Sequence, residues 1–253
     1  MTLATSSRFR ASGLALSLWL AGTTGAGAGC GDAPAARVDW TGCAKNNLLL
    51  TGDDMAGAVM SKAVLTGTTL SKAKLARAKL SEAEVSLAKF EEAELSEASF
   101  ERAIGWRVNF KGAKLEKANF TTAQMSRSNF AGSKLAGAIF AKSEINRSDF
   151  TGADLQGADL SKAEIARVVF KDAKLKGVNF TSSNLSRAKL GGLDLAEVRL
   201  AGAYLYLTDL TGADLSGASG LAQAQLDAAC GSQGTKLPPG LNRPKSWPCT
   251  EDE

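Results

Sequence analysis

Apolar residues recur at every fifth position of this chain from Leu50 to Leu215, and Gly105 is the one exception. We call these positions anchors; Leu or Phe fills most of them. A small residue, most often Ala, stands two positions before nearly every anchor, and the other three positions are mostly polar. A helix buries residues with a period near 3.6 and a simple strand with a period of 2, so a period of five fits neither. The pattern instead predicts short strands and tight turns in a solenoid, whose units bury their apolar faces against their neighbours.

Two longer periods underlie the five-residue block. All nine anchor phenylalanines lie a multiple of ten residues apart. Five arginines, which we call the Arg column, recur every twenty residues: Arg107, Arg127, Arg147, Arg167 and Arg187. Four blocks per coil explain both observations. They predict a four-sided rod in which Phe stacks in two columns on opposite faces and Arg climbs one outer face.

The blocks TGADL at 151–155, QGADL at 156–160 and TGADL at 211–215 show the consensus most plainly. Over roughly residues 38–220 the chain resembles the pentapeptide-repeat family, whose consensus is roughly Ala-(Asp/Asn)-(Leu/Phe)-X-X. The resemblance implies an all-β solenoid, the right-handed quadrilateral β-helix of that family. At one strand spacing of about 4.8 Å per coil, about eight to nine coils make a rod roughly 40 Å long.

The sequence ERAIG WRVNF departs from the repeat at Gly105. Ile104 and Trp106 are the candidates to replace the missing anchor, and we expect a local distortion of the coil. Two interpretations of Trp106 stay open, a repaired repeat defect and a position of functional interest.

Residues 1–29 lack the repeat and have the layout of an export signal. Two arginines form a basic start, and an apolar stretch, too short for a transmembrane helix, follows from about Ala11 to Gly22. The sequence Gly27-Ala28-Gly29-Cys30 is similar to a bacterial lipobox, with Gly27 where Leu is usual. It predicts acylation of Cys30, which would give a membrane-anchored lipoprotein of the bacterial envelope. The alternative is ordinary cleavage after Ala28, which would give a soluble periplasmic or secreted protein.

The expected state of the four cysteines depends on this processing. An exported chain can keep disulfides, and a bridge between Cys230 and Cys249 would close a short loop and stabilise the fold by roughly 2–4 kcal/mol. Acylation of Cys30 would leave Cys43 unpaired, whereas ordinary cleavage would allow these two to pair. The chain has no His and no CxxC pair, so we expect no metal site.

The segments at either end of the repeats have separate expected roles. Residues 30–37 are expected to form a flexible tether, and Trp40 falls on the anchor register as a plug over the first coil. Residues 221–253 are expected to form a short helix followed by a Pro-rich tail. Because an open β-helix end exposes unpaired backbone and core, we expect this segment to cap the rod.

Charge restricts the class of partner. The chain has 30 Lys and Arg against 26 Asp and Glu, a net charge of +4, and removal of the two leader arginines gives 28 − 26 = +2. Some members of the resembled family mimic DNA and bind type II topoisomerases, which requires a strongly acidic rod in the cytoplasm. The slightly basic charge and the export signal disfavour that role, and we expect no nucleic-acid partner.

No positioned base, nucleophile or metal set is evident, and filled coils leave no cavity, so we expect neither an enzyme nor a cofactor. The leading hypothesis is a monomeric, non-catalytic structural or interaction rod in the envelope, with an unidentified partner. The alternative is that the Arg column binds a polyanion such as an acidic glycan or lipopolysaccharide. Five like charges about 5 Å apart repel one another unless anions intervene. Glu144 and Glu164 are candidates to neutralise part of the column.

Overall fold

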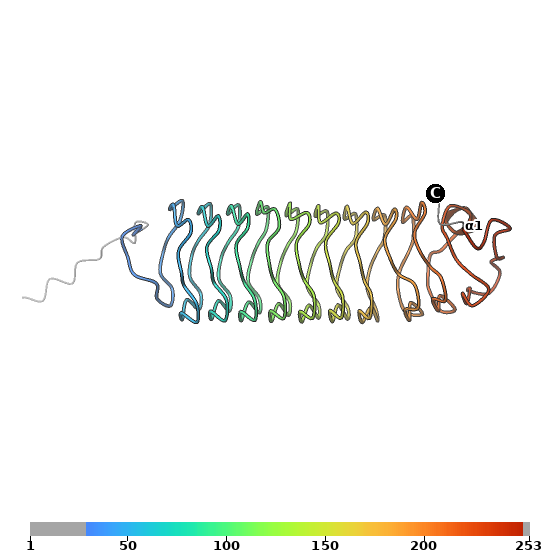
Figure 1. Cartoon of the computed structure of the whole chain (residues 1–253), viewed down its shortest axis with the longest axis horizontal. Coiled ribbons are helices and arrows are strands. Elements are labelled where there is room, and N and C mark those ends of the chain that lie inside the picture. The colour runs from blue at the N-terminus through green and yellow to red at the C-terminus, as the bar shows by residue number, and fades with distance from the viewer. Residues whose placement is uncertain (1–28, 250–253) are drawn as a thin grey trace, which may run out of the picture.

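The computed structural model describes residues 29–249, which form a rod of stacked coils (Figure 1). Residues 1–28 and 250–253 lie outside the described range, and the expected export signal falls almost wholly on them. Within 29–249, none of the chain forms a helix with the length and apolar character needed to cross a membrane.

Parallel bridges join residues twenty positions apart along the rod. The series begins with Asp39 and Val59 and continues to Arg199 and Ser219, with one bridge residue in each five-residue block. The described blocks contain isolated bridges and no longer strand. Four bridges per twenty residues give the four-sided coil that the sequence predicts. One bridge of the series is missing, between Lys174 and the residue twenty positions later, where a pocket of about 280 Å³ opens in the wall.

Most blocks fold in the same way. Positions one and two form a turn, position three is a buried small residue, position four is the bridge residue and position five is the buried anchor. The anchor carbonyl accepts a hydrogen bond from the amide three residues later, as from Ala58 to Met55 at 3.0 Å. Position two has a positive φ in most blocks, which is the signature of a type II turn, and Glu197 and Gly217 are exceptions. Twenty-two described non-glycine residues adopt a positive φ, including all five arginines of the Arg column at φ of 55–60°.

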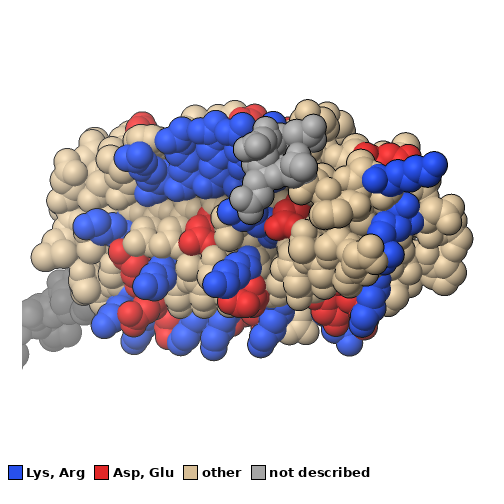
Figure 2. All heavy atoms as spheres, turned by 45° about the vertical axis from the view of Figure 1, so that its right-hand side comes forward, with Lys and Arg blue, Asp and Glu red and all other residues tan. Residues whose placement is uncertain are grey.

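The anchors fill the inside of the rod, and Lys, Arg, Asp and Glu lie on its outside (Figure 2). Phe110 stacks on Phe130 with ring centroids 4.9 Å apart, and Phe120 stacks on Phe140 at 4.6 Å. Rings of the two columns meet edge to face, as Phe110 and Phe120 do at 5.7 Å. Both geometries are favoured between aromatic rings. The two Phe columns predicted from the sequence are confirmed.

Neither Ile104 nor Trp106 replaces the anchor missing at Gly105. Both side chains point outward and are 54% and 44% exposed. The space is filled from within the coil and from the coil before it. A Cβ on Gly105 would lie 2.6 Å from Cγ2 of Val108 and 2.9 Å from Cγ2 of Val85.

The distortion expected at this block changes the hydrogen bonding of turns and leaves the bridges of the coil in place. Ile104 keeps its bridges to the coils on either side. In the turn that follows, the amide of Val108 donates to Oγ of Ser128 at 3.1 Å and does not bond the Gly105 carbonyl. The equivalent turn one coil later has the same arrangement. There, the amide of Ser128 donates to Oγ of Ser148 at 3.0 Å. The coil path is therefore kept while the turn hydrogen bond changes partner.

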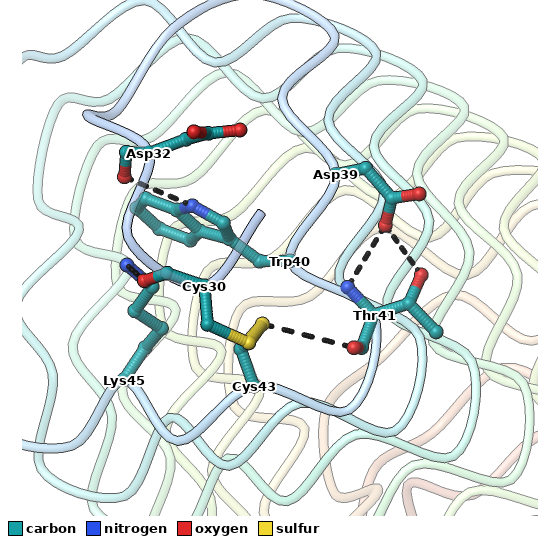
Figure 3. Close-up of a disulfide and its surroundings, with 7 residues drawn as sticks. All are labelled: Cys30, Asp32, Asp39, Trp40, Thr41, Cys43 and Lys45. Atoms are coloured by element: carbon teal, nitrogen blue, oxygen red, sulfur yellow. Dashed lines mark hydrogen bonds between the residues drawn. A yellow bond between two sulfur atoms is a disulfide. The ribbon is translucent and has the colours of Figure 1, made fainter. Parts of the chain in front are cut away.

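Residues 30–37, expected to be a flexible tether, are instead folded against the first coil (Figure 3). Cys30 is joined to Cys43 by a disulfide, and its carbonyl accepts a hydrogen bond from Nζ of Lys45 at 2.8 Å. Trp40 is 1% exposed, and the Lys45 ammonium lies 3.9 Å from its ring centroid. Trp40 thus covers the first coil, as expected.

The disulfide bears directly on the lipid expected at Cys30. One sulfur atom cannot form both a disulfide and a thioether to a lipid. The observed pairing is the one that ordinary cleavage would allow. Acylation of Cys30 stays a prediction, because the lipobox-like sequence lies partly outside residues 29–249.

Beyond residue 220 the chain forms α1, Gln223–Asp227, at the C-terminal end of the rod (Figure 1). Leu226 is buried, and the side-chain amide of Gln225 donates to the carbonyls of Leu200 and Ala203 at 2.8 Å each. This helix therefore supplies side-chain donors to two backbone carbonyls of the preceding coil.

Bridges resume after α1, so the solenoid extends beyond its expected limit at residue 220. The last of them joins Asp214 to Lys236, with an offset larger than twenty because the helix is inserted. A second disulfide joins Cys230 to Cys249, the pair expected from the sequence. Trp247 is 8% exposed, which places the Pro-rich tail against the core.

Candidate functional site

The five arginines of the Arg column all lie at position two of a turn on one outer face, and all are exposed. Each backbone amide donates to a carbonyl of the next coil, as Arg127 does to Asn146 at 2.8 Å. The backbone therefore holds one arginine of the column in each coil, and successive arginines lie about 4.8 Å apart.

Other charged columns of the rod alternate in sign. In one of them, Lys114 and Glu94 form a salt bridge at 2.8 Å in successive coils. This hydrogen bond lowers the pKa of Glu94 and raises the pKa of Lys114. The same column holds further pairs of this kind: Lys74 with Asp54, Lys174 with Asp154, and Lys236 with Asp214. Elsewhere the rod thus tends to stack opposite charges.

The Arg column differs because, within residues 29–249, none of its arginines has a carboxylate within 4.0 Å. Glu144 and Glu164, expected to neutralise part of the column, have other partners. Glu144 accepts a hydrogen bond from Gln124 at 3.4 Å, and Glu164 accepts one from Asn184 at 2.7 Å. Figure 2 shows an unbroken band of Lys and Arg side chains on the rod, next to surfaces where the two signs alternate. Among residues 29–249, the column is a row of like charges without carboxylate counter-charges.

Exposed aromatic side chains lie at both ends of the Arg column. At one end, the guanidinium of Arg107 lies 4.2 Å from the ring centroid of Trp106. At the other, the rings of Tyr204 and Tyr206 are nearly parallel with centroids 6.2 Å apart, and both are about half exposed. Sequence reasoning singled out Trp106 but missed the tyrosines. The position of the tyrosines in the repeat could have identified them, because Tyr206 occupies the same block position as Trp106, five coils later.

A pocket of about 550 Å³ lies at the tyrosine end. Its lining includes Arg187, Tyr206 and Leu207 from the rod, and Asp227 and Cys249 from the C-terminal segment. The last arginine of the column thus faces a hollow between the coils and that segment.

The described part of the chain contains no group of three His, Cys, Asp or Glu side chains placed to hold a metal ion. Each buried side-chain nitrogen or oxygen described there has a hydrogen-bond partner.

Models of one repeat family match most of the rod. The model of the pentapeptide repeat region matches residues 123–200. The model of pentapeptide repeats in eight copies matches residues 50–81, 70–104, 83–121 and 183–219. No curated protein matches the chain.

Several solved structures are similar. HetL, a pentapeptide repeat protein involved in heterocyst differentiation regulation from the cyanobacterium Nostoc sp. strain PCC 7120, is 29% identical; the match covers 81% of this chain and 93% of HetL, with a TM-score of 0.42. QnrB1, a plasmid-mediated fluoroquinolone resistance protein, is 18% identical over 77% of this chain and 91% of its own, with a TM-score of 0.55. A pentapeptide repeat protein from the Arabidopsis thaliana thylakoid lumen is 30% identical over 45% of this chain and 74% of its own, with a TM-score of 0.29. The likeness to QnrB1 supports the fold, a right-handed β-helix solenoid.

Proposed function

Because this chain belongs to the pentapeptide-repeat family, we propose that it acts as a non-catalytic interaction rod whose partner binds along an outer face. Filled coils leave the outer columns as the surface that a partner can contact. The observation that carries the proposal is the Arg column, a row of exposed like charges without carboxylate partners among residues 29–249. The finer architecture that we assign is about eight to nine quadrilateral coils, closed at the C-terminal end by the segment from residue 221.

We further propose that the protein is exported. Disulfides persist in oxidising compartments outside the cytosol, and two disulfides join the ends of the rod to their neighbouring segments. The Cys30–Cys43 pair favours a soluble exported form over a lipid-anchored one. Mass analysis of the mature protein decides between them: two disulfides on an unmodified chain support the soluble form, whereas diacylglyceryl on Cys30 would establish the anchored form.

Photo-crosslinking tests whether one face is used. A photoreactive amino acid replaces Ser126, beside the Arg column, or Ala136, at the same block position on the opposite face of the same coil. The interaction rod predicts a discrete cross-linked species from position 126 in the native envelope and little from position 136. Equal products from both positions, or none from either, would contradict the proposal.

The second candidate function, polyanion binding, is favoured because the Arg column has no carboxylate partners within residues 29–249. Its test is retention of the whole protein on a heparin-like resin. The triple variant R127Q/R147Q/R167Q should elute at lower salt than the wild type. The matched control is K117Q/K142Q/K162Q, because these lysines also lie at position two of a turn, with φ of 57–60°, but on other faces. No retention of the wild type, or the same shift in both variants, rules out binding by the column.

A DNA-mimic role on a topoisomerase is the least favoured of the three. Mimicry of DNA requires rows of negative charge, and the longest like-charge column among the described residues is cationic.

A further inference from the structure

We propose that the Arg column and the two columns beside it form one bounded site for a linear acidic glycan, with Trp106 and Tyr206 marking its ends. This inference rests on the polyanion binding proposed above and adds the ligand class, the length of the site and the residues that set both.

Three neighbouring columns build the site, because successive coils repeat every twenty residues. The Arg column occupies position two of its blocks, with Leu87 one coil before it and Leu207 one coil after it. The central column occupies position one of the same blocks: Trp106, Ser126, Asn146, Ala166, Ser186 and Tyr206. The polar column occupies position four of the preceding blocks: Ile104, Gln124, Glu144, Glu164, Asn184 and Tyr204.

The central column is less exposed along its middle than at its two ends. Trp106 and Tyr206 are exposed, whereas the four residues between them are small and half-buried. Five coil steps separate the two rings, which is roughly 24 Å at about 4.8 Å per step. The polar column ends in the same coils with large exposed side chains, Ile104 at 54% and Tyr204 at 55%. Large side chains thus bound the stretch that holds all five arginines.

The two edges of the site, which are the Arg column and the polar column, differ in chemistry, and this selects the ligand class. Guanidinium groups on one edge bind carboxylate or sulfate groups. On the other edge, carboxylates and side-chain amides accept hydrogen bonds from hydroxyl groups. A linear acidic glycan carries both kinds of group along its length. A polyphosphate chain offers no row of hydroxyl donors that could offset its repulsion by Glu144 and Glu164.

The aromatic ends suit a sugar ring. Trp and Tyr combine an apolar ring face with a polar edge, and the C–H face of a pyranose is apolar while its rim is polar. At the far end, the pocket of about 550 Å³ beside Arg187 and Tyr206 gives space for a terminal sugar. The aromatic ends therefore define the length of the site, and the Arg column defines its charge.

A length series tests the bounded site on the whole protein. Binding of uronic acid oligosaccharides of two to eight sugars is measured by calorimetry. Affinity should rise with length and level off at about five or six sugars, since each coil step is about one strand spacing. The variant W106A/Y206A should weaken binding of the longer oligosaccharides about tenfold without changing its salt dependence. The control I139A removes an exposed apolar side chain on another face and should have no effect.

The second test uses the polar column, with inorganic polyphosphate as the comparison ligand. Removing both carboxylates in E144A/E164A should strengthen polyphosphate binding, because repulsion is lost, and weaken oligouronate binding, because hydroxyl acceptors are lost. Both glutamates are exposed, so the variant should fold. Equal strengthening for both ligands would show that the polar column acts only through its charge and would overturn the glycan site.

The outcomes separate the two proposals. If the wild type binds neither ligand, polyanion binding and the glycan site both fail. If it binds both ligands equally through the Arg column, with no levelling in the length series and no effect of W106A/Y206A, the glycan site alone fails.

Discussion

Val108 occupies the space that a side chain at Gly105 would need, with its Cγ2 2.6 Å from the position of a Cβ. The repeat consensus would place Leu at 105, but this coil is already filled. G105L should therefore destabilise the protein, by about 1–3 kcal/mol from overpacking. Chemical denaturation of wild type and variant measures the difference.

The double variant G105L/V108A provides the control for this interpretation. Truncating Val108 frees the crowded space and restores a small residue at position three. The double variant should recover much of the stability lost by G105L, giving a favourable interaction energy in a double-mutant cycle. Simple additivity of the two changes would contradict the packing argument.

The turn geometry makes a separate prediction for the Arg column. Arg147 has a φ of 59°, a conformation that Gly adopts freely and β-branched residues strongly disfavour. R147G should leave the free energy of unfolding within about 0.5 kcal/mol, whereas R147V should lower it by about 1–3 kcal/mol. K142G and K142V, at the equivalent turn position on another face, should behave alike. A large loss in R147G would mean that the arginine side chain itself stabilises the rod.

The Cys230–Cys249 disulfide should stabilise the C-terminal end, since it closes a loop with a sequence separation of 19. The variant C230S/C249S should lose about 2–4 kcal/mol. Hydrogen exchange should show where the loss falls: amides of α1 and of the coil beneath it should exchange faster, and amides near Phe120 should not. Uniform acceleration along the rod would show that the end segment does not act as a local cap.

Acid should weaken the same end through Asp214. Hydrogen bonds from Lys236 and Ser216 lower the pKa of Asp214 to about 2, below its ordinary value of 3.8. Because the folded-state pKa is depressed, the stabilisation is fully present above about pH 4 and is lost as the pH falls towards 2. Calorimetric melting between pH 2 and 6 should show D214N less stable than wild type at pH 6, with the difference vanishing near pH 2. A constant difference would assign the effect to packing.

The fold was largely predictable because the five-residue blocks repeat the same pattern of buried and exposed positions. The anchors identified the inward positions, and the ten-residue spacing of Phe identified the two stacked columns that the structure contains. Gly105 was harder, because the residues that fill its space come from a different block position, Val108, and from the preceding coil, Val85. A five-residue register does not show such substitution between positions.

The candidate site was predictable only in part. The twenty-residue period placed the five arginines in one column, but whether Glu144 and Glu164 would pair with them depended on side-chain directions that spacing does not give. The tyrosines lay in the sequence at the register of Ile104 and Trp106, five coils on, yet their relevance depended on exposure. Residues 30–37 read as a tether because they lack the repeat, while a disulfide and hydrogen bonds hold them in place.

The most direct measurement is the salt dependence of binding of a heparin-like oligosaccharide to the wild type, R127Q/R147Q/R167Q and K117Q/K142Q/K162Q. Each charge contact with a polyanion releases condensed counterions, so the slope of log K against log salt reports the number of contacts. The Arg column predicts that the slope falls by roughly 2–3 in the arginine variant and stays at its wild-type value in the lysine control. Equal slopes in all three proteins would contradict a binding role for the column.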